Sequence, residues 1–247
     1  MRNLTLPLPT SLALLALVLF AGCSSNSTSS TSADGPQLRL NATLATSNTL
    51  QKAVQSDSLV ISEVKLLVDE IEFERDDDSM YDEFETGPLV VTLNANAPVS
   101  EIALSNIPAG IYDEIEFDID SGDDHPTLSD TDFLPDANSD DGYSIIVRGT
   151  LRGQAFLFRT DEDFEIELEF DRPIQVMDDG IVDLTLSIDP MAWFKTSNGT
   201  LLDPTDASNQ SRIEAAIERS FDVFEDSDRD GEDDYDDDEY DDDEDDD

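Results

Sequence analysis

The chain has 247 residues, of which 60 are acidic and 13 basic, so its formal net charge at neutral pH is −47. A surface of this sign repels phosphate groups, which excludes nucleic acid and anionic lipid headgroups as favoured partners. The only cysteine is Cys23, so no internal disulfide can form.

The acidic residues are spread along almost the whole chain. Residues 34–225 hold 43 acidic and 11 basic side chains, and residues 226–247 hold 17 acidic and one basic. Repulsion at this density destabilises a compact state, but at about 1 M salt the Debye length is near 3 Å and screens most of it. We therefore expect a halophilic, salt-adapted surface. The alternative is that the charge serves one partner, a basic protein or calcium.

Residues 1–22 have the pattern of a Sec-type signal peptide. Arg2 provides a positive charge, Leu12–Phe20 is an unbroken apolar run, and Ala21 and Gly22 are small residues before the cysteine. A transmembrane helix needs about 20 apolar residues, and this run is much shorter. The pattern therefore predicts export.

The end of this segment, Phe20-Ala21-Gly22-Cys23, resembles the lipobox of bacterial lipoproteins, although that family usually has Leu at the place of Phe20. The resemblance implies cleavage before Cys23, lipidation of its sulfur and, because Ser24 and not Asp follows, an outer-membrane location. Residues 23–33 are rich in Ser and Thr and are expected to form a flexible tether. The alternative is an ordinary secreted protein with a stray cysteine.

Residues 34–225 are predicted to form one mainly β domain, an antiparallel β-sandwich or barrel, of which we favour the sandwich. Short segments of alternating apolar and acidic residues are separated by turn residues, with no helical crossovers between them. In the longest segment the alternation slips between Val68 and Ile71, as a β-bulge would make it do. The predicted strands are Leu38–Leu44, Leu59–Phe73, Leu89–Leu93, Ile102–Leu104, Ile111–Ile119, Ile145–Val147, Ala155–Phe158, Phe164–Phe170 and Ile181–Ile188.

One amphipathic helix is predicted over residues 212–224, covering one end of the sandwich. Ser211 and Glu214 have the spacing of a capping box. Apolar residues then recur at helical spacing, at Ile213, Ala216, Ile217, Phe221 and Phe224.

Three stretches of the domain carry a family resemblance: LVISEVKLLVDEIEFE (59–74), IPAGIYDEIEFDID (107–120) and VDLTLSIDPMAWF (182–194). They resemble an uncharacterised family of bacterial lipoproteins with a domain of unknown function. The resemblance implies an immunoglobulin- or transthyretin-like β-sandwich on a lipid tether. That family has no assigned catalytic residues, so none are implied here.

Residues 226–247 are predicted to be a disordered polyacidic tail. Its first twelve residues nevertheless resemble the calcium loops of EF-hands and thrombospondin-type repeats, with carboxylates at loop positions 1, 3, 5, 9 and 12 and glycine at position 6. Asp233 at position 8 and the lack of an exiting helix depart from the EF-hand pattern. The alternative is a chance match within an acidic tail. The ligands implied by the resemblance are the side chains of Asp226, Asp228, Asp230, Asp234 and Asp237 and the backbone carbonyl of Glu232.

The sequence contains no catalytic motif, and its single histidine, His125, lies in a polar loop. We therefore expect a non-enzymatic, lipid-anchored outer-membrane or cell-surface protein with a binding or structural role. One alternative is a calcium-dependent surface interaction or glycan-binding module. Trp193, at the end of a predicted strand, is expected to pack in the core, and the alternative is that it stacks on a sugar or a partner. A second alternative is a glycoside hydrolase that uses two carboxylates.

Overall fold

The computed structural model describes residues 36–45, 59–75, 88–95, 99–122, 128–137, 140–178 and 180–234. The predicted signal peptide, Cys23, the tether, His125 and Asp237 lie outside the described residues. All described residues belong to one compact unit, residues 34–247.

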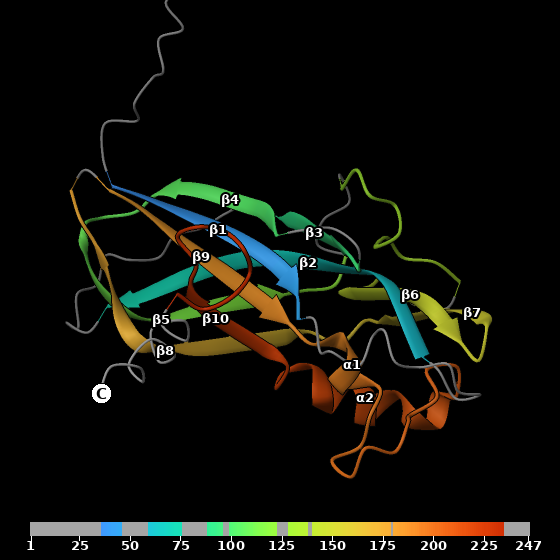
Figure 1. Cartoon of the computed structure of the whole chain (residues 1–247). Coiled ribbons are helices and arrows are strands. Elements are labelled where there is room, and N and C mark those ends of the chain that lie inside the picture. Colours follow the sequence, from blue (N-terminus) through green and yellow to red (C-terminus); the bar gives the residue numbers. More distant parts are fainter. Residues whose placement is uncertain are drawn as a thin grey trace, which may run out of the picture. The chain divides into compact units, whose positions relative to one another are not determined.

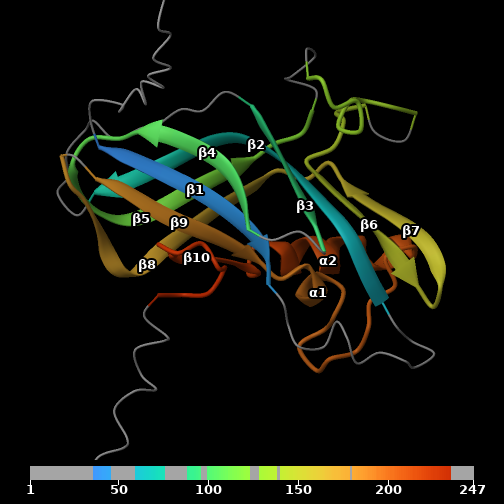
Figure 2. The same cartoon turned by 45° about the horizontal axis from the view of Figure 1, so that its top comes forward.

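The unit consists of two packed β-sheets (Figure 1). The four-stranded sheet has the order β10-β9-β1-β4, which Figure 2 shows side by side. The other sheet has the order β7-β6-β2-β5-β8, with β3 also paired to β2. The strands are β1 Gln37–Leu44, β2 Leu59–Arg75, β3 Leu89–Asn94, β4 Ser100–Asn106, β5 Gly110–Ile119, β6 Ile145–Leu151, β7 Gln154–Thr160, β8 Phe164–Val176, β9 Ile181–Ile188 and β10 Phe221–Glu225.

The predicted mainly β sandwich is confirmed, with one exception to its antiparallel pairing. β1 and β9 run parallel, from Gln37 beside Ile181 to Leu44 beside Ile188. These two strands are distant in sequence, so no short hairpin forces them to run in opposite directions.

The core lies between the sheets and is filled by the apolar residues of the alternating segments. Along β2, Val64, Leu66, Val68, Ile71 and Phe73 are all buried. The pairing of β2 with β5 shifts register between Val68 and Glu70, which confirms the predicted bulge. The shift keeps the apolar side chains on the core face on both sides of it.

The predicted helix over residues 212–224 is only half right. Helix α2 spans Gln210–Ile217, and residues Phe221–Glu225 form β10, which pairs with β9. The apolar residues Phe221 and Val223 alternate with Asp222, so the same segment also satisfies a strand pattern. The segment forms a strand rather than a helix because it pairs with the edge of β9.

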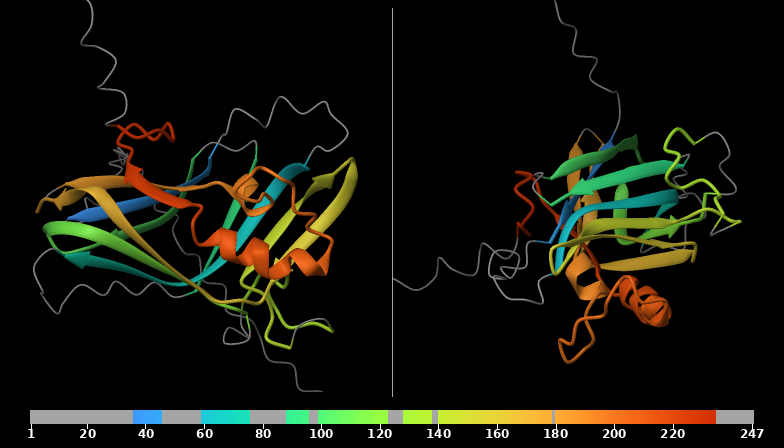
Figure 3. Two further views of the ribbon diagram at one scale, coloured as in Figure 1. Left: turned by 90° about the horizontal axis from the view of Figure 1, so that it is seen from below. Right: turned by 90° about the vertical axis from the view of Figure 1, so that its right-hand side faces the viewer.

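The predicted capping box is also wrong. Asn209 is the N-cap of α2 and makes no side-chain cap bond, while Glu214 accepts hydrogen bonds from Thr160 Oγ1 at 2.8 Å and Gln210 Nε2 at 2.6 Å. Glu214 therefore links Gln210, the first residue of the helix, to Thr160 at the end of β7 instead of completing a capping box with Ser211. Figure 3 (left) shows α2 lying across the ends of β6 and β7.

A short helix, α1 (Pro190–Trp193), and a 3-10 turn, η1 (Ala207–Asn209), complete this end of the domain. Trp193 is fully buried, and its indole N–H donates to Ser220 Oγ. The core interpretation of this tryptophan is therefore confirmed, and stacking of its ring on a sugar is excluded by burial.

Candidate metal site

The loop after β10, residues 226–234, folds back over the outer face of the four-stranded sheet. Asp226 N donates to Asp183 O at 3.1 Å, which continues the β10–β9 pairing by one residue. Beneath the loop, Asn41 and Thr185 are buried, although both point away from the core. The predicted disorder of residues 226–247 is therefore wrong for 226–234, because the sheet supplies partners that the acidic sequence lacks.

Asp226 is the centre of this loop, and its side chain has no exposed surface. Its Oδ2 accepts hydrogen bonds from Thr185 Oγ1 at 2.6 Å and from Gly231 N at 3.1 Å, and its Oδ1 accepts from Asp230 N at 3.0 Å. Burying a carboxylate is costly unless donors compensate for lost water. Three donors do so here, and they fix the position of the carboxylate within the loop.

Three of the predicted ligands are brought to one point. Asp226, Asp228 and Asp234 each offer a carboxylate oxygen, and these oxygens lie within 4.8 Å of one another. Calcium binds oxygens at about 2.3–2.6 Å, so ligands on opposite sides of one ion lie about 4.6–5.2 Å apart. The arrangement therefore suits a shared calcium ion.

The remaining predicted ligands are placed differently. Asp230 is in the loop, but its Oδ1 accepts from Glu232 N at 2.9 Å, and it is not one of the three clustered carboxylates. Glu232 is exposed. Asp237 lies outside the described residues.

Gly231 occupies the position where the calcium-loop pattern requires glycine. Its φ angle is +89°, which favours glycine, and an added Cβ would lie 3.0 Å from Val99 Cγ2. The loop therefore turns sharply and approaches the start of β4 closely. No pattern in the sequence identified Thr185 as a partner of Asp226, because the contact depends on how β9 and the loop pack.

Two arginines, Arg39 and Arg229, lie near this loop. Arg39 pairs with Asp183 at 2.7 Å and with Glu101 at 3.2 Å. Arg229 Nε lies 4.0 Å from Asp183 Oδ1. Both arginines pair with carboxylates outside the cluster of Asp226, Asp228 and Asp234.

The outer face of the six-stranded sheet carries a second concentration of carboxylates, which we call the acidic grid. It consists of three cross-strand rows on β2, β5 and β8, set by the register of these strands. The rows are Glu70–Asp118–Glu165, Glu72–Glu116–Glu167 and Glu74–Glu114–Glu169.

Within the grid the carboxylates repel one another. Carboxylate oxygens of Glu116, Glu165 and Glu167 lie within 4.8 Å of one another. Burial, and then the charges of Glu165, Asp118 and Glu72, raise the pKa of Glu116 to about 7. The pKa values of Glu114 and Asp118 are also raised, first by burial and then by neighbouring carboxylates.

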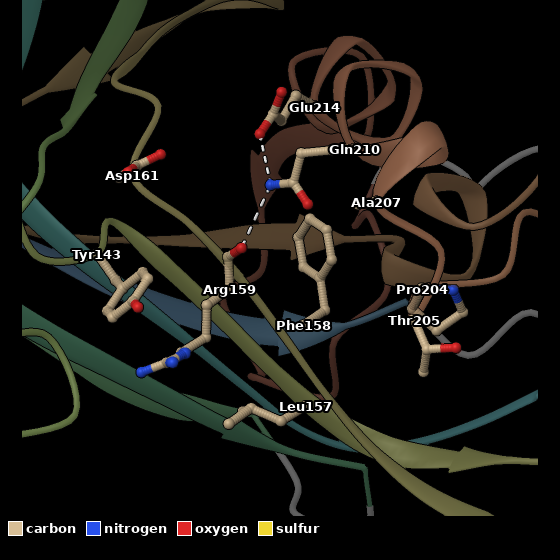
Figure 4. A pocket seen from close by; sticks show the side chains of 10 residues that line it. All are labelled: Tyr143, Leu157, Phe158, Arg159, Asp161, Pro204, Thr205, Ala207, Gln210 and Glu214. Carbon is tan, nitrogen blue, oxygen red and sulfur yellow. Dashed lines mark hydrogen bonds between the residues drawn. The ribbon is translucent and has the colours of Figure 1, made fainter. Parts of the chain in front are cut away.

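A groove of about 690 Å³ lies between β7 and the segment around α2 (Figure 4). Two carboxylates, Asp161 and Glu214, are among its lining residues. Arg159 stacks over the ring of Tyr143, with its guanidinium carbon 3.9 Å from the ring centroid, and pairs with Asp136 at 2.9 Å. These contacts close one side of the groove.

Comparison with known proteins adds no assignment: no protein-family model, curated protein or solved structure matches the chain. Along the part of the chain that the structure describes, no helix is long and apolar enough to cross a membrane. The lipoprotein family resemblance, the lipid anchor and the absence of catalysis therefore stay predictions.

Proposed function

We propose that the protein is a lipid-anchored, non-enzymatic binding or structural protein of the outer membrane, whose C-terminal loop 226–234 binds calcium. The anchor is Cys23, at the end of the predicted signal peptide. The calcium ligands are Asp226, Asp228 and Asp234, completed by oxygens from Asp230, Glu232 or Asp237.

One observation carries the calcium assignment: residues predicted as ligands from their spacing converge on one point in a loop that is folded against the sheet. Oxygens of Asp226, Asp228 and Asp234 lie within 4.8 Å of one another, which is close enough for one calcium ion to contact all three. Calcium prefers hard oxygen ligands and tolerates irregular geometry, which suits carboxylates on a surface loop.

Calcium at this point would offset the repulsion among these carboxylates. The loop would then be held on the four-stranded sheet more strongly, and with it β10, because Asp226 is the residue that follows the last β10 residue. Calcium would thus stabilise the folded C-terminal edge. In the absence of calcium, high salt alone would have to screen the same charges.

The test is a thermal melt of residues 24–247 in EDTA, in about 10 mM calcium, and in sodium chloride of matched ionic strength. With a dissociation constant near 1 mM, as in extracellular modules, calcium adds about 1.4 kcal/mol, or about 3–6 °C in melting temperature. The double variant D228N/D234N should lose this gain. The variant D233N makes a charge change of the same kind in the same loop and should keep the gain.

If sodium chloride alone stabilises all three proteins equally and calcium adds nothing, the calcium assignment is wrong and the loop pattern reflects composition. Isothermal titration of the wild-type protein with calcium gives an independent measure of the same affinity.

The anchor has its own test. Full-length protein expressed in a Gram-negative host should partition with the outer-membrane fraction and incorporate labelled fatty acid, and C23S should do neither. Recovery of full-length wild-type protein in the periplasmic soluble fraction without label would contradict the anchor and leave the calcium assignment untouched.

A further inference from the structure

β7 is an edge strand that lacks acidic residues. Within the described part of the chain it pairs only with β6, and the pairing from Ile145–Thr160 to Leu151–Gln154 has no register shift. β3 (LVVTLN), like β7, has no acidic residue and no proline, while the other described strands that pair on one side only, β4, β8 and β10, all contain acidic residues, and β8 also contains Pro173. β7, with the sequence QAFLFRT, contains none. Charged residues and proline protect sheet edges from pairing with other chains. β7 has no proline, and its one charged side chain, Arg159, is paired with Asp136 and stacked on the Tyr143 ring.

The backbone of β7 offers hydrogen-bonding groups on the side away from β6. A two-residue turn, Arg152-Gly153, with φ angles of 52° and 77°, joins Leu151 and Gln154, which makes these two residues a hydrogen-bonded pair. Hydrogen-bonded and non-hydrogen-bonded pairs alternate along an antiparallel ladder, so the backbone N–H and C=O groups of Ala155, Leu157 and Arg159 point away from β6.

A side-chain contact supports this direction. Gln210 Nε2, from α2, donates to the carbonyl of Arg159 at 3.3 Å (Figure 4). Two residues earlier, Leu157 turns its N–H and C=O to the same side, and its side chain is 48% exposed. An exposed leucine on an edge without acidic residues or proline favours pairing with another strand.

The groove of about 690 Å³ begins at this edge. Figure 4 shows β7 on one side, with Leu157, Phe158 and Arg159, and the segment that carries Pro204, Ala207 and Gln210 on the other. The lining combines apolar surface with the carboxylates of Asp161 and Glu214.

We propose that the outer edge of β7 and this groove bind an extended peptide segment of neutral or basic character by strand addition. The peptide backbone pairs with Leu157, and one peptide side chain enters the groove. Strand addition obtains affinity from main-chain hydrogen bonds and specificity from pockets for alternate side chains, and both are present here. The proposal is independent of calcium binding.

The negative charge of the groove and of the whole chain favours a neutral or basic peptide over an acidic one. The groove contributes the carboxylates of Asp161 and Glu214, and the hydrogen bonds that Glu214 accepts come from the uncharged side chains of Thr160 and Gln210. The charge of Arg159 is paired with Asp136. A second copy of the chain would bring another net charge of −47 to the edge, and an acidic peptide would be repelled in the same way.

The probe is a short labelled peptide of alternating valine and lysine. Two control peptides are matched to it. In the first, glutamate replaces each lysine, and in the second, every other backbone nitrogen is methylated, so that one edge of the peptide strand has no N–H donors. Binding is followed by fluorescence anisotropy in about 1 M sodium chloride, where a Debye length near 3 Å suppresses non-specific attraction. The valine–lysine peptide should bind. N-methylation should weaken binding about tenfold, because it removes main-chain hydrogen bonds.

Two variants test the site. L157P removes an outward N–H without removing a bond to β6, and A207W fills the groove; each should weaken binding about tenfold. L157V keeps the N–H and is the matched control. Hydrogen exchange of the wild-type protein provides a test without mutation: the Leu157 amide should become protected on binding, while those of Phe156 and Phe158, bonded to β6, are protected throughout.

Failure of the valine–lysine peptide to bind, equal binding to L157P, A207W and wild type, or protection that appears on the acidic grid and not at Leu157, would overturn the proposal. Concentration-dependent self-association of the free protein that L157P abolishes would also overturn it, because the occupant of the edge would then be a second copy.

Discussion

The loop 226–234 and the acidic grid both concentrate carboxylates on the outside of a sheet, but they treat the charge differently. In the loop, Asp226 is fully buried and accepts hydrogen bonds from Thr185 and from two backbone amides. In the grid, Glu116 faces Glu72 and Glu167 on neighbouring strands, and its pKa is raised to about 7.

The difference comes from the backbone. A tight loop points its N–H groups inward, where carboxylates can accept from them, and leaves oxygens directed at one point. The N–H groups of β2, β5 and β8 lie in the plane of the sheet and pair with neighbouring strands. The same residue type therefore forms a candidate ligand set in one place and a repulsive surface in the other. Four substitutions test this contrast.

The largest effect is expected for D226A. Removing the carboxylate takes away the acceptor of the buried Thr185 hydroxyl and of the Gly231 amide, which lowers the free energy of unfolding by about 2–3 kcal/mol even in EDTA. Urea unfolding measures the change. The matched variant D228A removes an exposed carboxylate from the same loop and should change stability by less than about 0.5 kcal/mol. Equal losses would show that Asp226 is not specially placed.

G231A should cost about 1–2 kcal/mol, because the residue has a positive φ and its Cβ would lie 3.0 Å from Val99 Cγ2. The control is G153A, at a φ of +77° with no atom within 4 Å of the added Cβ. Thermal melts of both variants separate backbone strain from the close approach. If G153A costs as much as G231A, the loop does not press on the start of β4.

In the grid, E116Q should stabilise the protein by up to about 1 kcal/mol at pH 8, since like charges on opposed strands are destabilising. The folded-state pKa of Glu116 is raised from 4.5 to about 7, so between these values the folded state binds more protons than the unfolded state. Wild-type stability should therefore rise as pH falls from about 7 towards 4.5, and E116Q should reduce this rise.

Urea unfolding between pH 4.5 and 8 measures both effects. The control E218Q makes the same charge change at an exposed position after α2, away from the grid, and should leave the pH profile unchanged. A profile that is the same for E116Q and wild type would show that the grid does not couple to folding.

The smallest effect is expected for E165Q. Glu165 is exposed and lies on the outer strand of the grid, so its removal should stabilise the fold by about 0.2–0.5 kcal/mol at low salt. In about 1 M sodium chloride the gain should vanish, because a Debye length near 3 Å screens exposed charges. A gain that persists in salt would indicate packing rather than repulsion.

Much of the architecture could be predicted from the sequence, because the alternation of apolar and acidic residues along a strand corresponds to alternation between its core face and its solvent face. The strands around Leu38, Phe117 and Ile166 bury most of the residues that the pattern places inside, although Ile111 is 49% exposed and Leu44 and Leu168 are half-buried. The bulge between Val68 and Glu70 was visible as a slip of that alternation. Asp226, Asp228 and Asp234, which the loop spacing assigns to one ion, lie close together in the structure, while calcium binding itself stays a prediction.

The failures involve partners that are distant in sequence. Residues 221–225 satisfied both a helical and a strand pattern, and the edge of β9 selected the strand. The order of residues 226–234 depends on Thr185, and the parallel pairing of β1 depends on β9. A pattern within one short stretch of sequence carries no information about contacts with distant segments.

The sequence by itself determined which residues face the core, where the chain bulges, and that Asp226, Asp228 and Asp234 have calcium-loop spacing, since each of these follows from neighbours along the chain. Tertiary structure alone decided that Asp226 is buried on the four-stranded sheet and that the carboxylates of β2, β5 and β8 align in rows. It also decided that β7, among the described strands, pairs only with β6 and lies beside a groove. The physical reason is that burial, strand register and edge position are set by which distant segments pack together.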